Sequence, residues 1–367
     1  MILTVDRTAL VEALAKVAGA IITRSPKPVL SCVHLEATTD TLYIAATDLE
    51  ISLRVSTGKL EVKEQGKAVI PFDKLSQIVR ESSDPTITLE VENTVATIRT
   101  KDSKYKVFGF KPEDYPAITA PGGDSVFTIS SEVLNRMITQ TAFATAKQNT
   151  RYAINGALME RDGAKLTFVA TDGHRLAVSK GTAMKAGGDN TRAGTIIPAK
   201  AMGLIKRLFD DDEALIKVQV ESNQVVFFDD GMSLTTNIVN GNFPPYRDVI
   251  PKDNNIKAVI DTQAMTSATR RAALLTSDES KGVRLSFTQE GVVVTSRAPE
   301  MGDAEIKLPL VSLEGEHVEI GFNPTFMLNG LKAVETDTIT LHLKAANKPG
   351  VIVADNFTYV IMPVNLD

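Results

Sequence analysis

Asp172, His174 and Ser179 are residue types that together form the catalytic triad of serine hydrolases. In such a triad the histidine takes the serine proton, so the serine oxygen can attack a carbonyl carbon. The spacing argues against this chemistry. Asp172 and His174 are two positions apart on an extended segment, so their side chains share one face of it without the mutual geometry that a triad requires. The tetrad Asp-Gly-His-Arg also lacks the Gly-x-Ser-x-Gly turn that exposes a nucleophilic serine. We therefore expect no catalytic residue here, and a different use for this turn.

Motifs for metal binding and for nucleotide binding are also absent from the sequence. The four histidines and the single Cys32 form no cluster at the spacing of metal ligands. The sequence contains no Gly-x-x-x-x-Gly-Lys-Ser/Thr phosphate loop and no Gly-x-Gly-x-x-Gly segment. We expect no metal, no cofactor and no enzyme activity.

Composition is that of a globular protein. The 367 residues are enough for two or three domains of roughly 100–200 residues, and 43% are hydrophobic. A single cysteine excludes an internal disulfide and fits a reducing compartment. The first residues do not resemble a signal peptide, and no run of about 18 apolar residues occurs. These features predict a cytoplasmic protein.

A threefold repeat organises the chain. Ala-Thr-Asp occurs at 46–48 and again at 170–172, and a third copy without the aspartate lies around Thr295. The copies are separated by 124 and 125 residues. Each copy is accompanied by two segments that run from a strand into a helix. A pair of strands with alternating apolar and polar residues ends each repeat. The sequence thus predicts an α+β fold of three similar domains with antiparallel sheets, at residues 1–122, 123–250 and 251–367.

Two helices are expected in each repeat. Candidate N-caps are Asp6, Ser130 or Ser131, and Asp261 or Thr262, and a proline lies near the first turn of each second helix. The predicted helices span residues 6–17, 72–81, 131–147, 198–209, 262–275 and 324–335.

Charge is unevenly distributed between these helices and the rest of the chain. The formal net charge is −5, whereas a nucleic-acid-binding domain is usually basic. The six predicted helices nevertheless carry +6 together, so the other residues carry −11. If the helices share one surface, that surface is cationic and can hold a DNA duplex through its phosphates without reading sequence.

Seven segments carry a family resemblance. They are KPVLSCVHLEA (from Lys27), TDLEIS (Thr47), RYAINGALME (Arg151), ATDGHRLAV (Ala170), NFPPYRDVIP (Asn242), KGVRL (Lys281) and YVIMPVNL (Tyr359). Together with the threefold repeat, they resemble the bacterial DNA polymerase III β subunit family, the β sliding clamps. The resemblance implies that two three-domain chains pair head to tail into a homodimeric ring, with helices lining the hole and sheets outside. It implies a processivity factor that encircles double-stranded DNA and tethers polymerase III, other polymerases, repair proteins and the clamp loader.

By this resemblance, the turn at 171–176 forms part of a pocket for partner peptides of the Gln-Leu-x-Leu-Phe type. Gly173 would let a backbone approach closely, and a methionine would let one pocket serve several partners. The expected pocket residues are Ile154, Thr171, Gly173, His174, Arg175, Leu176, Pro244, Val249, Val360, Met362, Pro363 and Val364.

The resemblance also implies DNA contacts and a dimer interface. The residues matched near DNA are Arg24, Gln148, Tyr152 and Lys206. On the dimer interface, Lys74, Tyr105 and Val107 match one side and Leu274 and Leu275 match the other. Glu300, Asp303 and Glu305 are possible partners of the basic side.

The sequence departs from the family pattern at four places. Asp248 stands where relatives often have an arginine, and Ser280 where some have an aromatic residue. The chain ends in Asn365-Leu366-Asp367 rather than in a basic residue and a leucine. Ala153 replaces a tyrosine near the DNA. We expect an altered peptide preference and a weaker hold on DNA at the position of Ala153.

Two other functions were weighed against a clamp. A catalytic or nucleotide-dependent DNA-processing protein with triplicated domains would need the phosphate loop or metal cluster that the sequence lacks. A structural scaffold without a DNA role predicts no concentration of basic charge on helices. A processivity clamp accounts both for the missing phosphate loop and metal cluster and for the basic charge on the helices.

Overall fold

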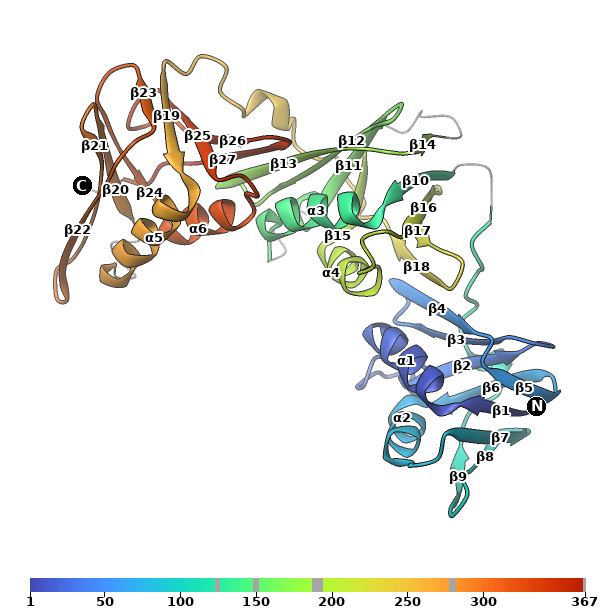
Figure 1. Cartoon of the computed structure of the whole chain (residues 1–367). Coiled ribbons are helices and arrows are strands. Elements are labelled where there is room, and N and C mark those ends of the chain that lie inside the picture. The colour runs from blue at the N-terminus through green and yellow to red at the C-terminus, as the bar shows by residue number, and fades with distance from the viewer. Residues whose placement is uncertain (123–125, 148–151, 187–193, 277–281, 366–367) are drawn as a thin grey trace. The chain divides into compact units, whose positions relative to one another are not determined.

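The computed structural model describes residues 1–122, 126–147, 152–186, 194–276 and 282–365. Within these ranges, no helix is long and apolar enough to cross a membrane. Six α-helices and four antiparallel sheets make up the described fold (Figure 1). The α+β class predicted from the sequence is confirmed.

The three repeats follow one another in the chain order of the elements. The first contains β1 (Ile2–Asp6), α1 (Arg7–Val17), η1 (Ala18–Ala20), η2 (Pro28–Ser31), β2 (Cys32–Ala37), β3 (Leu42–Thr47), β4 (Ile51–Thr57), β5 (Leu60–Glu64), β6 (Gly66–Pro71), α2 (Phe72–Glu81), β7 (Thr86–Glu92), β8 (Val95–Arg99), β9 (Lys104–Phe108) and η3 (Pro112–Asp114). The second contains β10 (Val126–Ser130), α3 (Ser131–Thr141), η4 (Ala142–Ala144), η5 (Tyr152–Ile154), β11 (Gly156–Asp162), β12 (Lys165–Thr171), β13 (Arg175–Thr182), β14 (Lys185–Ala186), β15 (Thr195–Pro198), α4 (Ala199–Leu208), β16 (Leu215–Val220), β17 (Gln224–Phe228), β18 (Met232–Asn237) and η6 (Tyr246–Asp248). The third contains β19 (Ile256–Asp261), α5 (Thr262–Ala272), η7 (Ala273–Leu275), β20 (Val283–Thr288), β21 (Gly291–Ala298), β22 (Gly302–Leu308), β23 (Ser312–Glu314), β24 (Val318–Phe322), α6 (Pro324–Lys332), β25 (Thr338–Leu343), β26 (Gly350–Ala354) and β27 (Phe357–Ile361).

Backbone pairing joins neighbouring repeats. The first nine-stranded sheet has the order β14-β10-β16-β17-β18-β4-β3-β2-β6, and the second has the order β15-β11-β12-β13-β27-β26-β25-β19-β23. In the first, β4 pairs with β18, and Ser52 faces Thr235. In the second, β13 pairs with β27, and Leu176 faces Val360. Equivalent strands of successive repeats therefore make equivalent joints.

Two equivalent strands remain at sheet edges. The five-stranded sheet has the order β5-β1-β7-β8-β9, and the four-stranded sheet has the order β22-β21-β20-β24. By position in the repeat, β9 corresponds to β18 and β27, and β22 corresponds to β4 and β13. Among the described residues, β9 and β22 each pair with a neighbouring strand on one side only. Their counterparts β18, β27, β4 and β13 each pair with strands on both sides.

The chain clusters into two compact units that divide the middle repeat. One contains residues 1–131, 184–189 and 204–238, and the other contains residues 132–183, 190–203 and 239–367. The division follows from the joints, because β16–β18 extend the sheet of the first repeat and β11–β13 extend that of the third.

Local chemistry sets the helix starts that the sequence predicted. The Asp6 carboxylate accepts a hydrogen bond from the Ala9 amide at 2.8 Å, and Asp261 accepts one from Ala264 at 2.7 Å. The choice between Asp261 and Thr262 is thereby decided for Asp261. The Asn323 side chain caps α6, where Pro324 is the first helical residue. Ser131 is the first residue of α3, and its hydroxyl donates to the Phe209 carbonyl at 2.5 Å.

The predicted third helix was too long. It ends at Thr141 instead of residue 147 and continues as the short 3-10 helix η4. The hydroxyls of Thr139 and Thr141 each bond back to the carbonyl four residues earlier, both at 2.7 Å. Such bonds compete with the helical ladder, and β-branched threonine is a weak helix former. The last predicted helix is also shorter, because α6 ends at Lys332 rather than at residue 335.

A close approach between α6 and β27 yields a test of the packing. A Cβ on Gly330 would overlap the ring of Tyr359, which is fully buried. We expect Gly330→Ala to lower the free energy of unfolding by about 1–3 kcal/mol, because an overfilled core must shift. The measurement is urea unfolding followed by circular dichroism.

Gly203 in α4 is the matched control, because a Cβ there meets nothing within 4 Å. Gly203→Ala is expected to stabilise the protein by about 0.5–1 kcal/mol through helix propensity. Equal urea midpoints for Gly330→Ala and Gly203→Ala would contradict the close packing of Gly330 against Tyr359.

Candidate functional site

The turn between β12 and β13 is held by its own side chains. Asp172 Oδ1 accepts hydrogen bonds from the amides of His174 (3.0 Å) and Arg175 (3.2 Å). The Thr171 hydroxyl accepts from the Gly173 amide at 3.1 Å and donates to the Arg175 carbonyl at 2.6 Å. Gly173 has φ of +91°, a conformation that L side chains rarely adopt. Thr, Asp and Gly therefore have structural roles at this turn.

Arg175 fixes the turn to the protein interior. Its side chain is only 7% exposed, and Nε lies 3.0 Å from Asp172 Oδ2. Its Nη2 donates to the Phe143 carbonyl at 2.8 Å, and the guanidinium carbon lies 4.4 Å from the centre of the Phe326 ring. His174 remains exposed, and its ring stacks on Phe326 at 6.4 Å between centroids. Ion pair and aromatic contact together keep the buried cation in place.

The residues do not form a triad. The Ser179 side chain is fully buried, and its hydroxyl donates to Gln140 Oε1 at 2.6 Å. Asp172 is bound to Arg175 and to two backbone amides rather than to the His174 ring. The prediction that this set does not act as a nucleophilic triad agrees with this geometry.

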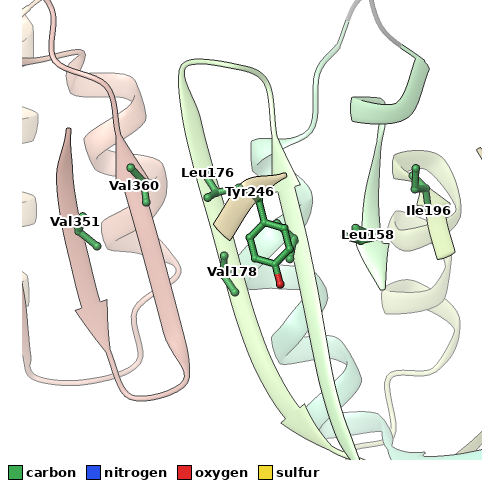
Figure 2. Packing of buried hydrophobic residues seen from close by; sticks show 8 residues of the cluster. Leu158, Leu176, Val178, Ile196, Tyr246, Val351 and Val360 are labelled. Atoms are coloured by element: carbon green, nitrogen blue, oxygen red, sulfur yellow. The ribbon is translucent and has the colours of Figure 1, made fainter. Parts of the chain in front are cut away.

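An apolar cluster lies beside the turn and spans the joint between β13 and β27. Figure 2 shows the Tyr246 ring with Leu176 and Val178 of β13 on one side and Leu158 and Ile196 on the other. Val360 of β27 and Val351 of β26 extend the cluster across the joint. Partly buried apolar residues pack against it, namely Ala153, Val239, Phe243, Ile250 and Val353.

Tyr246 is anchored by its hydroxyl. The hydroxyl donates to Glu160 Oε2 at 2.7 Å, and the same oxygen accepts from Arg247 Nη2 at 2.6 Å. Burial, followed by the hydrogen bond to Glu160, raises the pKa of Tyr246 to about 12. The hydroxyl therefore stays protonated at neutral pH and holds the ring in the cluster.

The C-terminal segment continues from β27 past the turn. The Met362 amide donates to the His174 carbonyl at 3.0 Å, and the Val364 amide donates to the Gly321 carbonyl at 2.9 Å. Met362, Pro363 and Val364 line a cavity of about 700 Å³, and the Met362 side chain is 40% exposed. A polarisable, half-exposed methionine at a cavity wall can adapt to different ligands. Arg284, Glu319, Ala346 and Asn347 also line this cavity.

The structure brings most of the predicted pocket residues together in one unit. Leu176 and Val360 belong to the cluster, and Ile154 is buried in η5. Thr171, Gly173, His174 and Arg175 form the turn that meets Met362. Pro244 is half-buried and Val249 is 47% exposed, both in the segment around η6. Asp248 is exposed in η6, whereas Ser280, Leu366 and Asp367 lie outside the described residues.

Two important residues were not singled out from the sequence. Tyr246 lies within the quoted segment NFPPYRDVIP, and the corresponding Tyr115 in KPEDYP could have drawn attention to it. The sequence predicts Phe326 only as part of a helix, because its contacts with His174 and Arg175 involve another repeat. Residue spacing contains no signal for such a contact.

The predicted DNA contacts are only partly described. Arg24 is exposed in the loop before η2, and Lys206 is exposed on α4. Gln148 lies outside the described residues, and Tyr152 is described only as the start of η5. Helix α4 also carries the exposed cations Lys200 and Arg207, and helix α5 carries the exposed cations Arg270 and Arg271. Neither helix contains an acidic residue.

Four of the predicted interface residues belong to the edge strands or contact them: Tyr105 and Val107 lie on β9, and Leu274 and Leu275 lie in η7, which packs against β22. On β9, Tyr105 is 43% exposed and Phe108 is 74% exposed, but Val107 is buried. Lys74 is exposed at the start of α2 and pairs with Asp73 at 3.3 Å. Leu274 in η7 is 71% exposed and Leu275 is half-buried. Phe108 is a further exposed apolar residue that the sequence reasoning did not name.

Three family models match successive parts of the chain. The N-terminal, central and C-terminal domains of the DNA polymerase III beta subunit match residues 1–119, 128–245 and 247–365.

Relatives match over almost the full length. The beta sliding clamp of Vibrio cholerae is 31% identical over 368 residues, and that of Escherichia coli K12 is 30% identical over 371, with 99% of each chain covered. The solved DNA polymerase sliding clamp of Bacillus subtilis has a TM-score of 0.95 at 25% identity, covering 100% of this chain and 99% of its own. A Pseudomonas aeruginosa sliding clamp bound to griselimycin has a TM-score of 0.94 at 29% identity, with both chains fully covered.

Proposed function

We infer the mechanism from one premise: the chain belongs to the DNA polymerase III beta subunit family, and its function is that of a DNA sliding clamp, a processivity factor in replication. The observation that carries this function is the match of all three domain models, in order, along the chain. From it we propose three domains with boundaries near residues 122 and 250. We also propose separate roles for the helices, the joint at β13–β27 and the two free edges.

The helices provide the surface for DNA. Lys200, Lys206 and Arg207 on α4 and Arg270 and Arg271 on α5 are exposed and unaccompanied by acidic residues on those helices. Such a surface attracts phosphates without reading bases. Because exposed lysine and arginine side chains are mobile and hydrated, the contacts can exchange as the protein moves along the duplex. Arg24 adds a cation from the loop before η2, and Gln148 and Tyr152 are further candidates.

The cluster around Tyr246 and the wall at Met362 provide a docking site for partner peptides. Leu176 and Val360 form a buried apolar layer beneath it, and Met362, Pro363 and Val364 line the cavity that the C-terminal segment borders. Apolar side chains of a Gln-Leu-x-Leu-Phe segment would bury against these residues, while backbone groups near Gly173 meet its polar atoms. The polymerase III catalytic subunit, other polymerases, repair proteins and the clamp loader are the proposed carriers of such segments.

The two free edges close a ring between two copies. In both joints within the chain, a β4-type strand pairs with a β18-type strand. The remaining pair of this kind is β22 of one copy and β9 of a second copy. The exposed side chains differ in net charge, because β9 carries Lys104 and Lys106, whereas β22 carries Asp303, Glu305 and Lys307, of which Glu305 and Lys307 pair with each other at 3.2 Å. Tyr105, Phe108 and Leu274 add apolar surface.

The chain is proposed to work without catalysis, metal or cofactor, as a protein of the bacterial cytoplasm associated with the nucleoid. The turn at Asp172 is fully used in structural bonds. Among the described residues, no group of three or more His, Cys, Asp or Glu side chains could hold a metal ion.

The docking site is tested by the fluorescence polarisation of a labelled Gln-Leu-Ser-Leu-Phe peptide. We expect saturable micromolar binding to the intact protein and about three- to tenfold weaker binding to Met362→Ala, because part of an apolar wall is removed. Met301→Ala is the control, since Met301 is equally apolar but lies in the turn between β21 and β22. No binding, or equal binding to both variants, would place the docking surface elsewhere.

The DNA surface is tested by retention of the loaded protein on nicked circular DNA at increasing salt. Arg24→Ala with Lys206→Ala should lower retention and reduce the slope of log K against log salt by about 0.9 for each phosphate that the variant no longer neutralises. The control pair is Arg99→Ala with Lys217→Ala, two exposed cations on strands β8 and β16. If the slope changed equally in the two double variants, Arg24 and Lys206 would not be the residues that contact the phosphates.

The free edges are tested by light scattering. Leu274→Ala with Leu275→Lys is expected to convert a dimer of the chain into monomers, because a charge at an apolar contact is costly to bury. Leu215→Lys changes another exposed leucine in the other unit and should leave the mass unchanged. A dimer that persists in the double variant would argue against an interface at η7.

A further inference from the structure

The first repeat contains a pocket at the position that the Tyr246 cluster occupies in the second. Strand register establishes the correspondence. Cys32 pairs with Pro71 as Gly156 pairs with Pro198, so His34 corresponds to Leu158. Thr47 pairs with Ser52 as Thr171 pairs with Leu176, so Arg54 corresponds to Val178. Tyr115 lies in KPEDYP as Tyr246 lies in NFPPY.

Three positions that are apolar in the second repeat are polar in the first, and a fourth polar replacement lies on the strand across the joint. His34 replaces Leu158, Ser52 replaces Leu176 and Arg54 replaces Val178. Across the joint, Thr235 of β18 replaces Val360 of β27, since these residues face Ser52 and Leu176. The tyrosine is kept in both repeats. The same backbone framework therefore presents a pocket of different chemistry.

The pocket has a volume of about 360 Å³ and lies entirely in one compact unit. Tyr115 forms its floor and packs against Cys32 and Val69. The Tyr115 hydroxyl accepts from the Thr47 amide and donates to the Cys32 carbonyl, both at 3.2 Å. Its lining is His34, Glu36, Tyr43, Ala45, Arg54, Lys67, Pro112, Glu113, Tyr115, Pro116, Ala117 and Ile118.

Arg54 is the cation in this pocket without an acidic partner. Its guanidinium carbon lies 3.7 Å from the centre of the Tyr43 ring, so the ring covers one face of the group. The other cation, Lys67, pairs with Glu36 at 3.0 Å. Across the described residues, no carboxylate lies within ion-pair distance of Arg54. A stacked guanidinium keeps its N–H edges available, and those edges match the two oxygens of a carboxylate.

We propose that this pocket binds an acidic side chain of a partner peptide, with the carboxylate held by Arg54. One side chain fits the volume, and Pro112, Pro116 and Ile118 offer apolar contact to a neighbouring residue of the peptide. Of the two carboxylates in the lining, Glu36 pairs with Lys67, whereas Glu113 repels each negative charge that enters the pocket. This repulsion is larger for a run of phosphates than for one carboxylate, so a single carboxylate is favoured over nucleic acid. His34, whose pKa is lowered by burial, adds a neutral hydrogen-bonding ring beside Tyr115. Binding at Arg54 is independent of peptide docking at Leu176.

The test uses methyl NMR spectra of the full chain labelled at alanine and isoleucine, with Ala45 and Ile118 as reporters in the pocket. The probes are the blocked peptides acetyl-Leu-Glu-Leu-amide and acetyl-Leu-Gln-Leu-amide, and inorganic phosphate. We expect saturable shifts with the glutamate peptide and at least about tenfold weaker binding of the glutamine peptide, because a neutral amide cannot form the charge-assisted bidentate pair with a guanidinium. This comparison needs no variant of the protein.

Variants then assign the binding to Arg54. Arg54→Gln should weaken the glutamate peptide at least about tenfold, and Arg54→Lys should weaken it less, since it keeps the charge but not the planar fork. Arg99→Gln, an exposed arginine on β8, should bind as the unchanged protein does. An unchanged urea midpoint for Arg54→Gln, followed by circular dichroism, together with unshifted alanine and isoleucine methyl signals outside the pocket, would show that the variant is folded.

Three results would overturn the proposal. They are equal binding of the glutamate and glutamine peptides, unchanged binding to Arg54→Gln, and tighter binding of phosphate than of the glutamate peptide. The last result would identify a phosphate site instead of a peptide site.

Discussion

Antiparallel pairing between equivalent strands of successive repeats is the interaction on which the rest of the structure depends. The β4–β18 and β13–β27 joints use the same strand types. Their hydrogen bonds satisfy edge groups that would otherwise be left exposed to other chains. Because each joint merges two sheets, the middle repeat is divided between two compact units. The strands β9 and β22 are the free counterparts of these joints, and this is the basis for the proposed pairing with a second copy.

The joint also determines which distant segments meet in the fold. At β13–β27, the turn at Gly173, the Tyr246 cluster and the C-terminal segment meet, although they are far apart in sequence. Arg175 stabilises this arrangement through Asp172, the Phe143 carbonyl and the Phe326 ring. At the corresponding place in the first repeat, His34 and Arg54 replace apolar residues. A repeated framework can therefore keep its backbone contacts while each copy acquires its own ligand chemistry.

In the proposed mechanism, DNA binding and peptide docking use surfaces of different chemistry. The exposed cations of α4 and α5 have no acidic residue on the same helix, whereas the Tyr246 cluster is apolar and is anchored by a part-buried hydrogen bond to Glu160. A long-range attraction to phosphates tolerates sliding, since it depends weakly on position. Apolar burial depends on shape and fixes one partner segment in place. The two functions use different physical interactions, and this allows one chain to move along DNA and hold a partner.

Local patterns in the sequence determined the helix starts, the strand hairpins and the threefold repeat, because caps and alternating side chains act over a few residues. Asp6 and Asp261 cap their helices as expected, and the Ala-Thr-Asp segments lead into hairpins. The candidate pocket residues came from resemblance to a family rather than from spacing. Only the tertiary structure decided that Tyr246 bonds to Glu160, that Phe326 covers Arg175 and that Arg54 lacks an acidic partner among the described residues. These contacts join residues from distant strands or different repeats, and their energies depend on packing and burial that no local pattern encodes.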